Sequence, residues 1–146
     1  MRKWSVLAGA VAAPLAGGEN ITSREMFLNF MDAGKLGVIQ PDVAKWGGVS
    51  GAIDIASAAK ERGVTCAMHY MGTGLGLAAS LHCLAAMNGN GPMELDANPN
   101  PLRTELGEID LTVTNGRIAV PTGPGIGFVP DPLALNSMTI AQLDLS

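Results

Sequence analysis

The chain has 146 residues and a formal net charge of −4; 47% of its residues are hydrophobic and 15% are charged, with 19 glycines and 9 prolines. This composition is too apolar for a disordered chain and too rich in turn residues for a helical bundle, and the length allows one domain with a core. Nucleic acid and membranes are excluded as partners, because the sequence has no basic cluster and no apolar run of the roughly 18 residues that span a bilayer.

The N-terminal stretch LAGAVAAPLAGGEN, residues 7–20, follows Arg2 and Lys3 and has two interpretations. Basic residues before a run of small apolar residues are typical of a secretory signal. Alternatively, the stretch is the end of a helix that runs into a buried strand and delivers Glu19. The difference decides the function, because cleavage near Ala16 would remove the strand that positions Glu19.

The centre of the chain alternates between short apolar runs and helical periodicity. Thr22, with Glu25 three residues later, predicts a capping box, and the helix that follows ends at Gly34. Further helices are predicted over residues 50–62 and 75–87, and strands over 38–42, 64–69 and 93–95. Strands that alternate with helices predict an α/β fold, in which a parallel sheet is connected by helical crossovers.

Four ionisable side chains stand where predicted strands end. Glu19, Asp42, His69 and Glu94 follow one another at intervals of 23, 27 and 25 residues. In parallel α/β folds the carboxyl ends of the strands form the edge where chemistry is done. We therefore expect these four side chains to converge on one site at the carboxyl edge of the sheet.

After Glu94 the sequence no longer alternates between strand and helix patterns. Residues 111–120 predict a hairpin with Asn115-Gly116 at its turn, residues 121–132 are a predicted loop, and residues 133–146 are expected to fray. We therefore divide the chain into residues 1–110, which carry the strand–helix units, and residues 111–146, the hairpin and tail.

Two cysteines, Cys66 and Cys83, lie in apolar segments and are expected to be buried free thiols in a reducing compartment, which indicates a cytoplasmic protein. The sequence has no further Cys or His at the spacing of a zinc site.

Five motifs occur in one order along the chain: PLAGGEN, QPDVAKWGGVSGA, CAMHYMGTGLGLAASLHCLAA, MELDANPNPLR and GRIAVPTGPGIG. From about Trp4 to Phe128 this combination resembles the C-terminal part of the mandelate racemase/muconate lactonizing enzyme family, in the enolase superfamily. The resemblance implies a partial (β/α)8 TIM-type barrel, made of the last four strand units, with a C-terminal β-hairpin. It also favours the helix-end interpretation of residues 1–12.

The resemblance implies a role for five residues. Glu19 corresponds to the third of three carboxylates that bind Mg²⁺. His69 corresponds to the general base and Asp42 to its partner, since a hydrogen-bonded carboxylate fixes the tautomer of an imidazole and raises its basicity. Glu94 corresponds to the acid that hydrogen-bonds the substrate carboxylate, for which it must stay protonated, as burial would favour. Lys45 recurs with Asp42 in the family motif and either tunes the couple or touches substrate.

Each role has a structural alternative. These are a Glu19 that caps a helix, a core His69 satisfied by backbone, a Glu94 paired with Arg103 and an exposed Lys45 at a helix start. His82, in the middle of an apolar helix, is interpreted as a packed histidine. Muconate lactonizing enzymes carry a Lys where this chain has Asp42 and lack this His, so the resemblance favours the mandelate racemase-like, sugar-acid branch.

The implied reaction is Mg²⁺-assisted removal of the proton alpha to the carboxylate of a sugar acid, which gives an enediolate, as the enolase superfamily does with a Lys or His base. Dehydration is the first choice and racemisation or epimerisation the second. The family's capping domain, its Lys-x-Lys strand and the first two metal carboxylates have no counterpart in this sequence. We therefore expect a fragment of a longer enzyme, a complementary barrel half on another chain, or a homo-oligomer. The rival hypotheses are a non-catalytic remnant or partner subunit, and an exported small binding protein.

Overall fold

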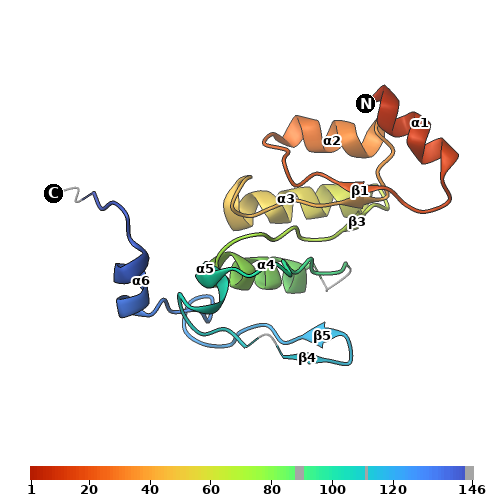
Figure 1. Ribbon diagram of the computed structural model, residues 1–146. Helices are drawn as coiled ribbons and strands as arrows, with labels where there is room; N and C mark the ends of the chain where they lie inside the picture. Colours follow the sequence, from red (N-terminus) through yellow and green to blue (C-terminus); the bar gives the residue numbers. More distant parts are fainter. Residues whose placement is uncertain (88–90, 111, 144–146) are drawn as a thin grey trace.

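The computed structural model describes residues 1–87, 91–110 and 112–143 and has the predicted α/β character (Figure 1). In chain order its elements are α1 (Arg2–Ala10), β1 (Ala16–Gly17), α2 (Arg24–Asp32), β2 (Val38–Ile39), α3 (Gly48–Glu61), β3 (Thr65–Cys66), α4 (Gly74–Ala86), α5 (Pro101–Thr104), β4 (Val113–Thr114), β5 (Arg117–Ile118) and α6 (Pro132–Met138). The alternation of strand and helix that the sequence predicts as far as α4 is confirmed.

The first three strands form a parallel sheet in the order β1-β2-β3. An isolated parallel bridge between Met68 and Met93 continues the sheet beyond β3. The strands are shorter than predicted: β2 ends at Ile39, before Pro41, which has no N–H to donate to a ladder. Hydrogen bonding nevertheless runs on, because the N–H of His69 donates to the carbonyl of Pro41 at 3.1 Å.

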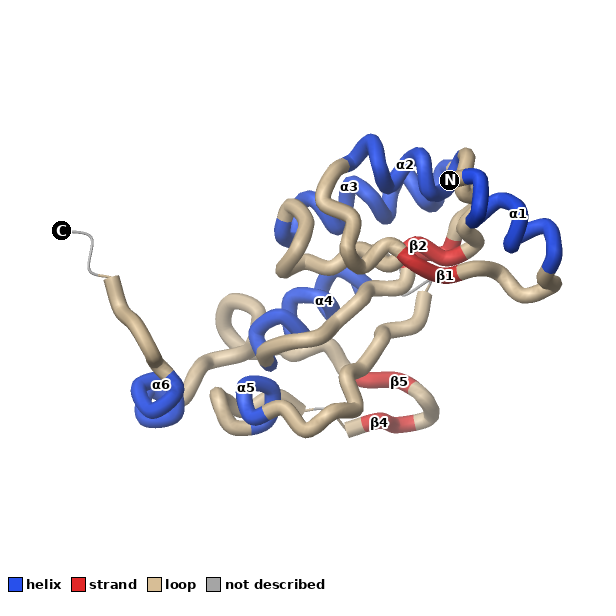
Figure 2. The backbone as a smooth tube through the Cα atoms, turned by 45° about the horizontal axis from the view of Figure 1, so that its top comes forward, coloured by secondary structure: helices blue, strands red, loops and turns tan. Residues whose placement is uncertain are grey.

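The main core lies between this sheet and the helices α2, α3 and α4, which contact one another in sequence order (Figure 2). Its largest fully buried apolar side chains include Phe27, Ile39, Ile55 and Met68. Leu77 of α4 is equally buried, against Tyr70 and Leu81 in a second cluster. Burial of large aliphatic and aromatic side chains is the main source of stability here, since each contributes about 1.5–3 kcal/mol.

The start of α2 differs from the predicted capping box by one residue. The N-cap is Ser23, not Thr22: Ser23 has the extended backbone of a cap (φ −149°), and its hydroxyl accepts a hydrogen bond from the N–H of Met26 at 3.3 Å. Both residue types are good caps, so the sequence alone did not distinguish them. Helix α3 begins two residues earlier than predicted, after Gly47, whose φ of 61° favours glycine.

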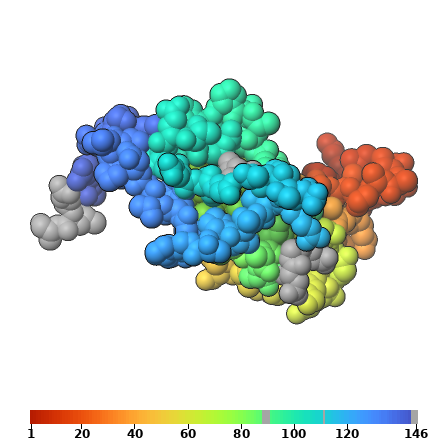
Figure 3. All heavy atoms as spheres, turned by 90° about the horizontal axis from the view of Figure 1, so that it is seen from below, coloured from red at the N-terminus to blue at the C-terminus, as the bar shows by residue number. Residues whose placement is uncertain are grey.

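The hairpin is confirmed as β4 and β5, joined by Asn115 and Gly116 with φ of 53° and 72°, as a type I′ turn requires. Figure 3 shows the hairpin and the loop that follows it, residues 112–130, lying over part of α4 on this face. Two short helices, α5 and α6, were not predicted; both have a proline at the first helical positions. The expected fraying of residues 133–146 is therefore wrong for α6, which Figure 1 shows apart from the packed body.

Leu111 and residues 144–146, which belong to the predicted hairpin and tail, lie outside the described residues. The division of the chain after residue 110 stays a prediction.

Residues 2–10 form the expected helix, α1, none of whose residues is buried. Trp4 packs edge-on against Phe30, with ring centroids 5.8 Å apart. In the part of the chain that the structure describes, no helix is both long and apolar enough to cross a bilayer. Cys66 and Cys83 are buried free thiols, as predicted, and burial, with a smaller effect of Cys83, raises the pKa of Cys66 to about 12.

Candidate active site

The ends of the parallel strands bring three of the predicted side chains into one row. Ile39 lies opposite Cys66 in the register of β2 and β3, so three residues further on Asp42 lies opposite His69. The bridge between Met68 and Met93 likewise places Glu94 beside His69. The expected convergence at the carboxyl edge therefore follows from strand register.

Asp42 and His69 form a buried couple at this edge. The Nδ1 atom of His69 lies 2.8 Å from Oδ2 of Asp42, and the side chains are 8% and 4% exposed. The other carboxylate oxygen, Oδ1, accepts the backbone N–H of Ala44 at 2.8 Å. Because a carboxylate only accepts hydrogen bonds, the geometry assigns a proton to Nδ1, and in the neutral ring Nε2 then has a lone pair. His69 is thus held by a side chain and not by backbone carbonyls.

Glu94 is exposed, so the described residues do not provide the burial that was expected for it. Its Oε2 accepts a hydrogen bond from Nε2 of Gln40 at 2.8 Å. The bond joins the end of β2 to the segment after Met93, across β3, which indicates that both side chains project from the same face of the sheet. Glu94 is not the partner of Arg103, which pairs instead with Asp96.

Glu19 reaches the same edge through a glycine. Gly18 has φ of 125°, and a Cβ at this position would lie 3.0 Å from Cδ1 of Ile39, so only glycine fits where β1 ends. Oε1 of Glu19 accepts a hydrogen bond from the amide of Asn20 at 3.2 Å.

Lys45 connects the two parts of the site. Its Nζ donates to Oδ1 of Asn20 at 3.1 Å and lies 3.9 Å from Oδ2 of Asp42. A polar path therefore runs from Glu19 through Asn20 and Lys45 to the Asp42–His69 couple. Lys45 is exposed, but its ammonium group is engaged on both sides, unlike that of a free surface lysine.

The donor set does not by itself fit a magnesium site. Mg²⁺ prefers six oxygen ligands in octahedral geometry. Among residues 1–87, 91–110 and 112–143, no three His, Cys, Asp or Glu side chains lie together as a metal site requires. Glu19 therefore has no second and third ligand of these types grouped with it among the described residues.

Sequence reasoning missed Gln40 and Asn20. Both are neutral amides, and the partner of Gln40 lies 54 residues away along the chain, so no local pattern identifies them. The available signal was position: Asn20 directly follows Glu19, and Gln40 lies two residues before Asp42. His82 is packed as predicted, with Nε2 3.1 Å from the carbonyl of Ile126.

Comparison with known proteins agrees with this architecture. A family model described as enolase C-terminal domain-like, for mandelate racemase/muconate lactonizing enzymes, matches residues 1–134. The D-galactarolactone cycloisomerase of Agrobacterium fabrum is 37% identical over 123 residues, which cover 79% of this chain and 32% of that protein. The arabinonate dehydratase of Saccharolobus solfataricus is 32% identical over 122 residues, which cover 84% of this chain and 32% of that protein.

A solved structure agrees as well. The crystal structure of a mandelate racemase/muconate lactonizing enzyme from Bordetella bronchiseptica matches with a TM-score of 0.84 and 45% identity, over 93% of this chain and 38% of that one. The chain spans about a third of the length of the named relatives it matches. Since the family match extends over nearly the whole chain, the chain belongs to the mandelate racemase/muconate lactonizing enzyme family of the enolase superfamily, within its C-terminal domain.

Proposed function

We propose that this chain carries the general-base part of an active site that removes the proton alpha to the carboxylate of a sugar acid. The observation that carries the proposal is the buried Asp42–His69 couple at the carboxyl edge of a parallel sheet, with Glu94 beside it. Two relatives, a D-galactarolactone cycloisomerase and an arabinonate dehydratase, support this substrate class.

In the proposed reaction, Nε2 of His69 takes the proton from the α-carbon, and the electron pair of the C–H bond moves into the enediolate. Asp42, held by Nδ1 and by the N–H of Ala44, stabilises the imidazolium that forms. His69 then returns its proton to the β-hydroxyl, the C–O bond breaks and water leaves. The remaining enol becomes a 2-oxo-3-deoxy acid. We propose dehydration as the first choice, and racemisation or epimerisation as the alternative outcome of the same proton removal.

We propose that Glu94 faces the substrate carboxylate. A protonated Glu94 would donate a hydrogen bond to a carboxylate oxygen as negative charge accumulates on it, which is where a fixed donor lowers the barrier. Gln40, whose amide contacts Glu94 at 2.8 Å, has a second N–H that is suited to the same oxygen. Lys45 is proposed to tune the Asp42–His69 couple through its 3.9 Å approach to Asp42.

We propose Mg²⁺ as the cofactor, with Glu19 as one of its ligands. When bound, the ion would supply a positive charge that favours formation of the enediolate. Because the described residues offer one carboxylate at this position, the other ligands must come from outside them.

We further propose that the four strand segments are part of a (β/α)8 barrel, completed by a complementary barrel half or by another copy of the chain. Among the described residues, β1 has a strand neighbour on one side only. Open sheet edges are normally covered or paired, which supports such a partner. The two buried free cysteines support a reducing compartment, and we propose the cytoplasm.

The second candidate function is a non-catalytic remnant or partner subunit. It is favoured by the incomplete metal donor set. Calorimetric titration with Mg²⁺ of the protein purified from its natural source, with any partner it carries, separates the two hypotheses: stoichiometric binding that is lost in Glu19→Gln supports an assembled site, whereas no binding supports the remnant.

The test of the proposed function uses the only two histidines of the chain. We expect the protein purified from its natural source to exchange the α-proton of a sugar acid with deuterium from D₂O. His69→Asn should lower this exchange about 10²–10⁴-fold, the contribution of general base catalysis. His82→Asn is the matched control and should retain it. Exchange that survives in His69→Asn would contradict the proposal.

A further inference from the structure

A partly buried ion pair lies in the turn that follows Glu94. Nη1 of Arg103 is 3.3 Å from Oδ2 of Asp96, and the side chains are 13% and 4% exposed. The ion pair between Arg24 and Asp54, by contrast, is about half exposed on both sides. Two charges withdrawn from water stabilise a fold only when their remaining hydrogen-bonding atoms also have partners. The hydrogen-bond partners of Asp96 and Arg103 therefore identify the backbone segments that this ion pair holds.

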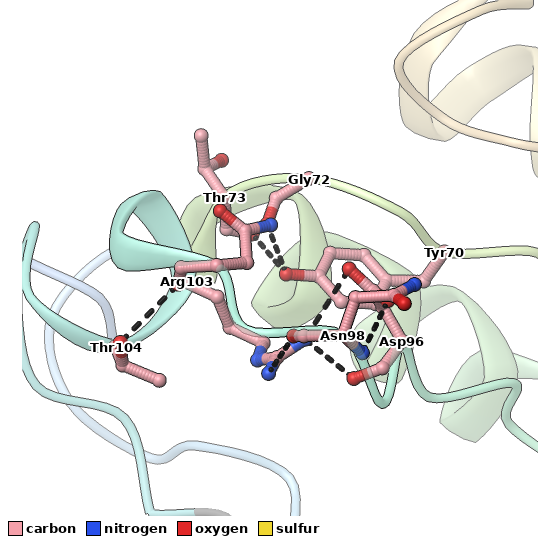
Figure 4. Close-up of polar contacts among 8 residues, drawn as sticks. Tyr70, Gly72, Thr73, Asp96, Asn98, Arg103 and Thr104 are labelled. Carbon is pink, nitrogen blue, oxygen red and sulfur yellow. Dashed lines mark hydrogen bonds and ion pairs between the residues drawn. The ribbon is translucent and has the colours of Figure 1, made fainter.

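The pair closes the turn on itself. Arg103 donates from Nη1 to the carbonyl of Asp96, and from Nη2 to the carbonyl of Asn98 at 2.9 Å (Figure 4). Oδ1 of Asp96 accepts the backbone N–H and the side-chain amide of Asn98, at 2.9 and 2.7 Å. These two hydrogen bonds, and then the charge of Arg103, hold the pKa of Asp96 below its usual value, so Asp96 is an anion at neutral pH.

The same turn is fastened to the loop that leaves His69. The amide of Asn100 donates to the carbonyl of Gly72 at 2.9 Å. The hydroxyl of Tyr70 lies 2.6 Å from the same oxygen and 3.0 Å from the carbonyl of Thr73 (Figure 4). Thr73 is in turn the N-cap of α4. One side-chain-to-backbone hydrogen bond, from Asn100 to Gly72, therefore joins the residues after Glu94 to those after His69, and the Tyr70 hydroxyl braces the 70–73 loop that receives it.

Glu94 lies between two anchors. Before it, Met93 bridges Met68, and the N–H of Glu94 donates to the carbonyl of Met68 at 3.2 Å. After it comes the turn that Asp96 and Arg103 close. Glu94 itself is exposed, so its position depends on its backbone and on the hydrogen bond from Gln40, because little packing surrounds its side chain.

We propose that Asp96 and Arg103 are positioning residues, which hold the carboxylate of Glu94 in place beside His69 by locking the 96–103 turn onto the 70–73 loop. The inference rests on the proposed function for the meaning of that position, but not for its geometry. This positioning role requires the planar guanidinium of Arg103, because a lysine ammonium cannot donate to two carbonyls and a carboxylate in the same arrangement.

The test follows the Gln40 side-chain amide by NMR, which reports the Gln40–Glu94 hydrogen bond directly. The chain has two glutamines, Gln40 and Gln142, so the signal is readily assigned. Glu94→Ala supplies the reference spectrum without the bond. We expect Arg103→Lys and Asp96→Asn to shift the Gln40 amide toward that reference. Arg24→Met, which breaks the exposed ion pair with Asp54, is the matched control and should leave the signal in place.

A turn that only stabilises the fold gives a different result. In that case Arg103→Lys lowers the midpoint of unfolding while the Gln40 amide of the folded protein stays unshifted, and this result would overturn the proposal. Asp96→Asn keeps the size of the side chain and provides a folded variant if the arginine substitution unfolds the protein. The NMR measurement needs no metal, substrate or turnover, so it remains valid if the proposed function is wrong. Conversely, an unshifted Gln40 amide would overturn the positioning role of Asp96 and Arg103 without contradicting the proposed function.

Discussion

Residues 15–87 contain both buried apolar clusters of the described structure, whereas about half of the large apolar side chains described in residues 91–143 are exposed. In the described part of the second region, Leu106 and Phe128 are the buried hydrophobic residues, and Leu133 and Ile140 are almost fully exposed. The second region is held instead by polar side chains that bind backbone groups, as around Arg103. The comparison shows two ways of holding a side chain at the strand edge: His69 is buried and bonded to Asp42, whereas exposed Glu94 is held through hydrogen bonds of its backbone and from Gln40.

The largest expected difference between the two regions comes from one substitution made in each. Leu77→Ala removes a fully buried side chain and should lower the free energy of unfolding by about 2–5 kcal/mol. Leu133→Ala, at a side chain that is 81% exposed, should change it by less than about 0.5 kcal/mol. Chemical denaturation of both variants measures the difference. Equal losses would show that α6 is packed as firmly as α4.

The alkaline titration of Tyr70 tests how firmly the two regions are joined. Burial raises the pKa of Tyr70 to about 12, although the positive charge of Arg103 opposes the rise. Because the raised pKa favours the neutral phenol in the folded state, this contribution to stability is complete below about pH 10 and is lost as the pH rises toward 12. Tyr70 is the only tyrosine, so absorbance of the tyrosinate follows it without assignment. A midpoint near 10 in the folded protein would mean that the hydroxyl faces solvent.

A smaller change in folding stability is expected at acidic pH, where Asp96 is protonated. The hydrogen bonds from Asn98, with the charge of Arg103, lower the pKa of Asp96. A lowered pKa contributes stability above the ordinary carboxyl range, and this stability is lost as the pH falls below about 4. Asp96→Asn should therefore flatten the acid side of the stability profile. Thermal unfolding from neutral to acidic pH measures it, with Asp54→Asn as the exposed control, and identical profiles for wild type and Asp96→Asn would contradict the account.

The packed region was the more predictable of the two, for physical reasons. Periodicity and strand-end spacing placed Asp42 and His69 correctly at one edge, since parallel register converts equal spacing into proximity. The cap of α2 was misplaced by one residue because Thr22 and Ser23 are both good caps. Helices α5 and α6 were missed, since segments of four and seven residues carry too few turns to show a period.

The polar contacts were less predictable, because they join residues that are far apart along the chain. The sequence suggested Arg103 as a partner for Glu94, but the structure gives it to Asp96, two residues further on. Gln40 instead pairs with Glu94. Strand geometry predicts which backbone positions are neighbours, but not which of two nearby carboxylates a long side chain will choose.

The most direct test of the central claim is a ¹H–¹⁵N NMR spectrum of the two imidazole rings at a pH where both are neutral. His69 should carry its proton on Nδ1, facing Asp42, and His82 on Nε2, facing the carbonyl of Ile126, so one spectrum should show opposite tautomers. Asp42→Ala should abolish the preference of His69 and leave His82 unchanged. A proton on Nε2 of His69, or a ring signal that does not respond to Asp42→Ala, would contradict the account.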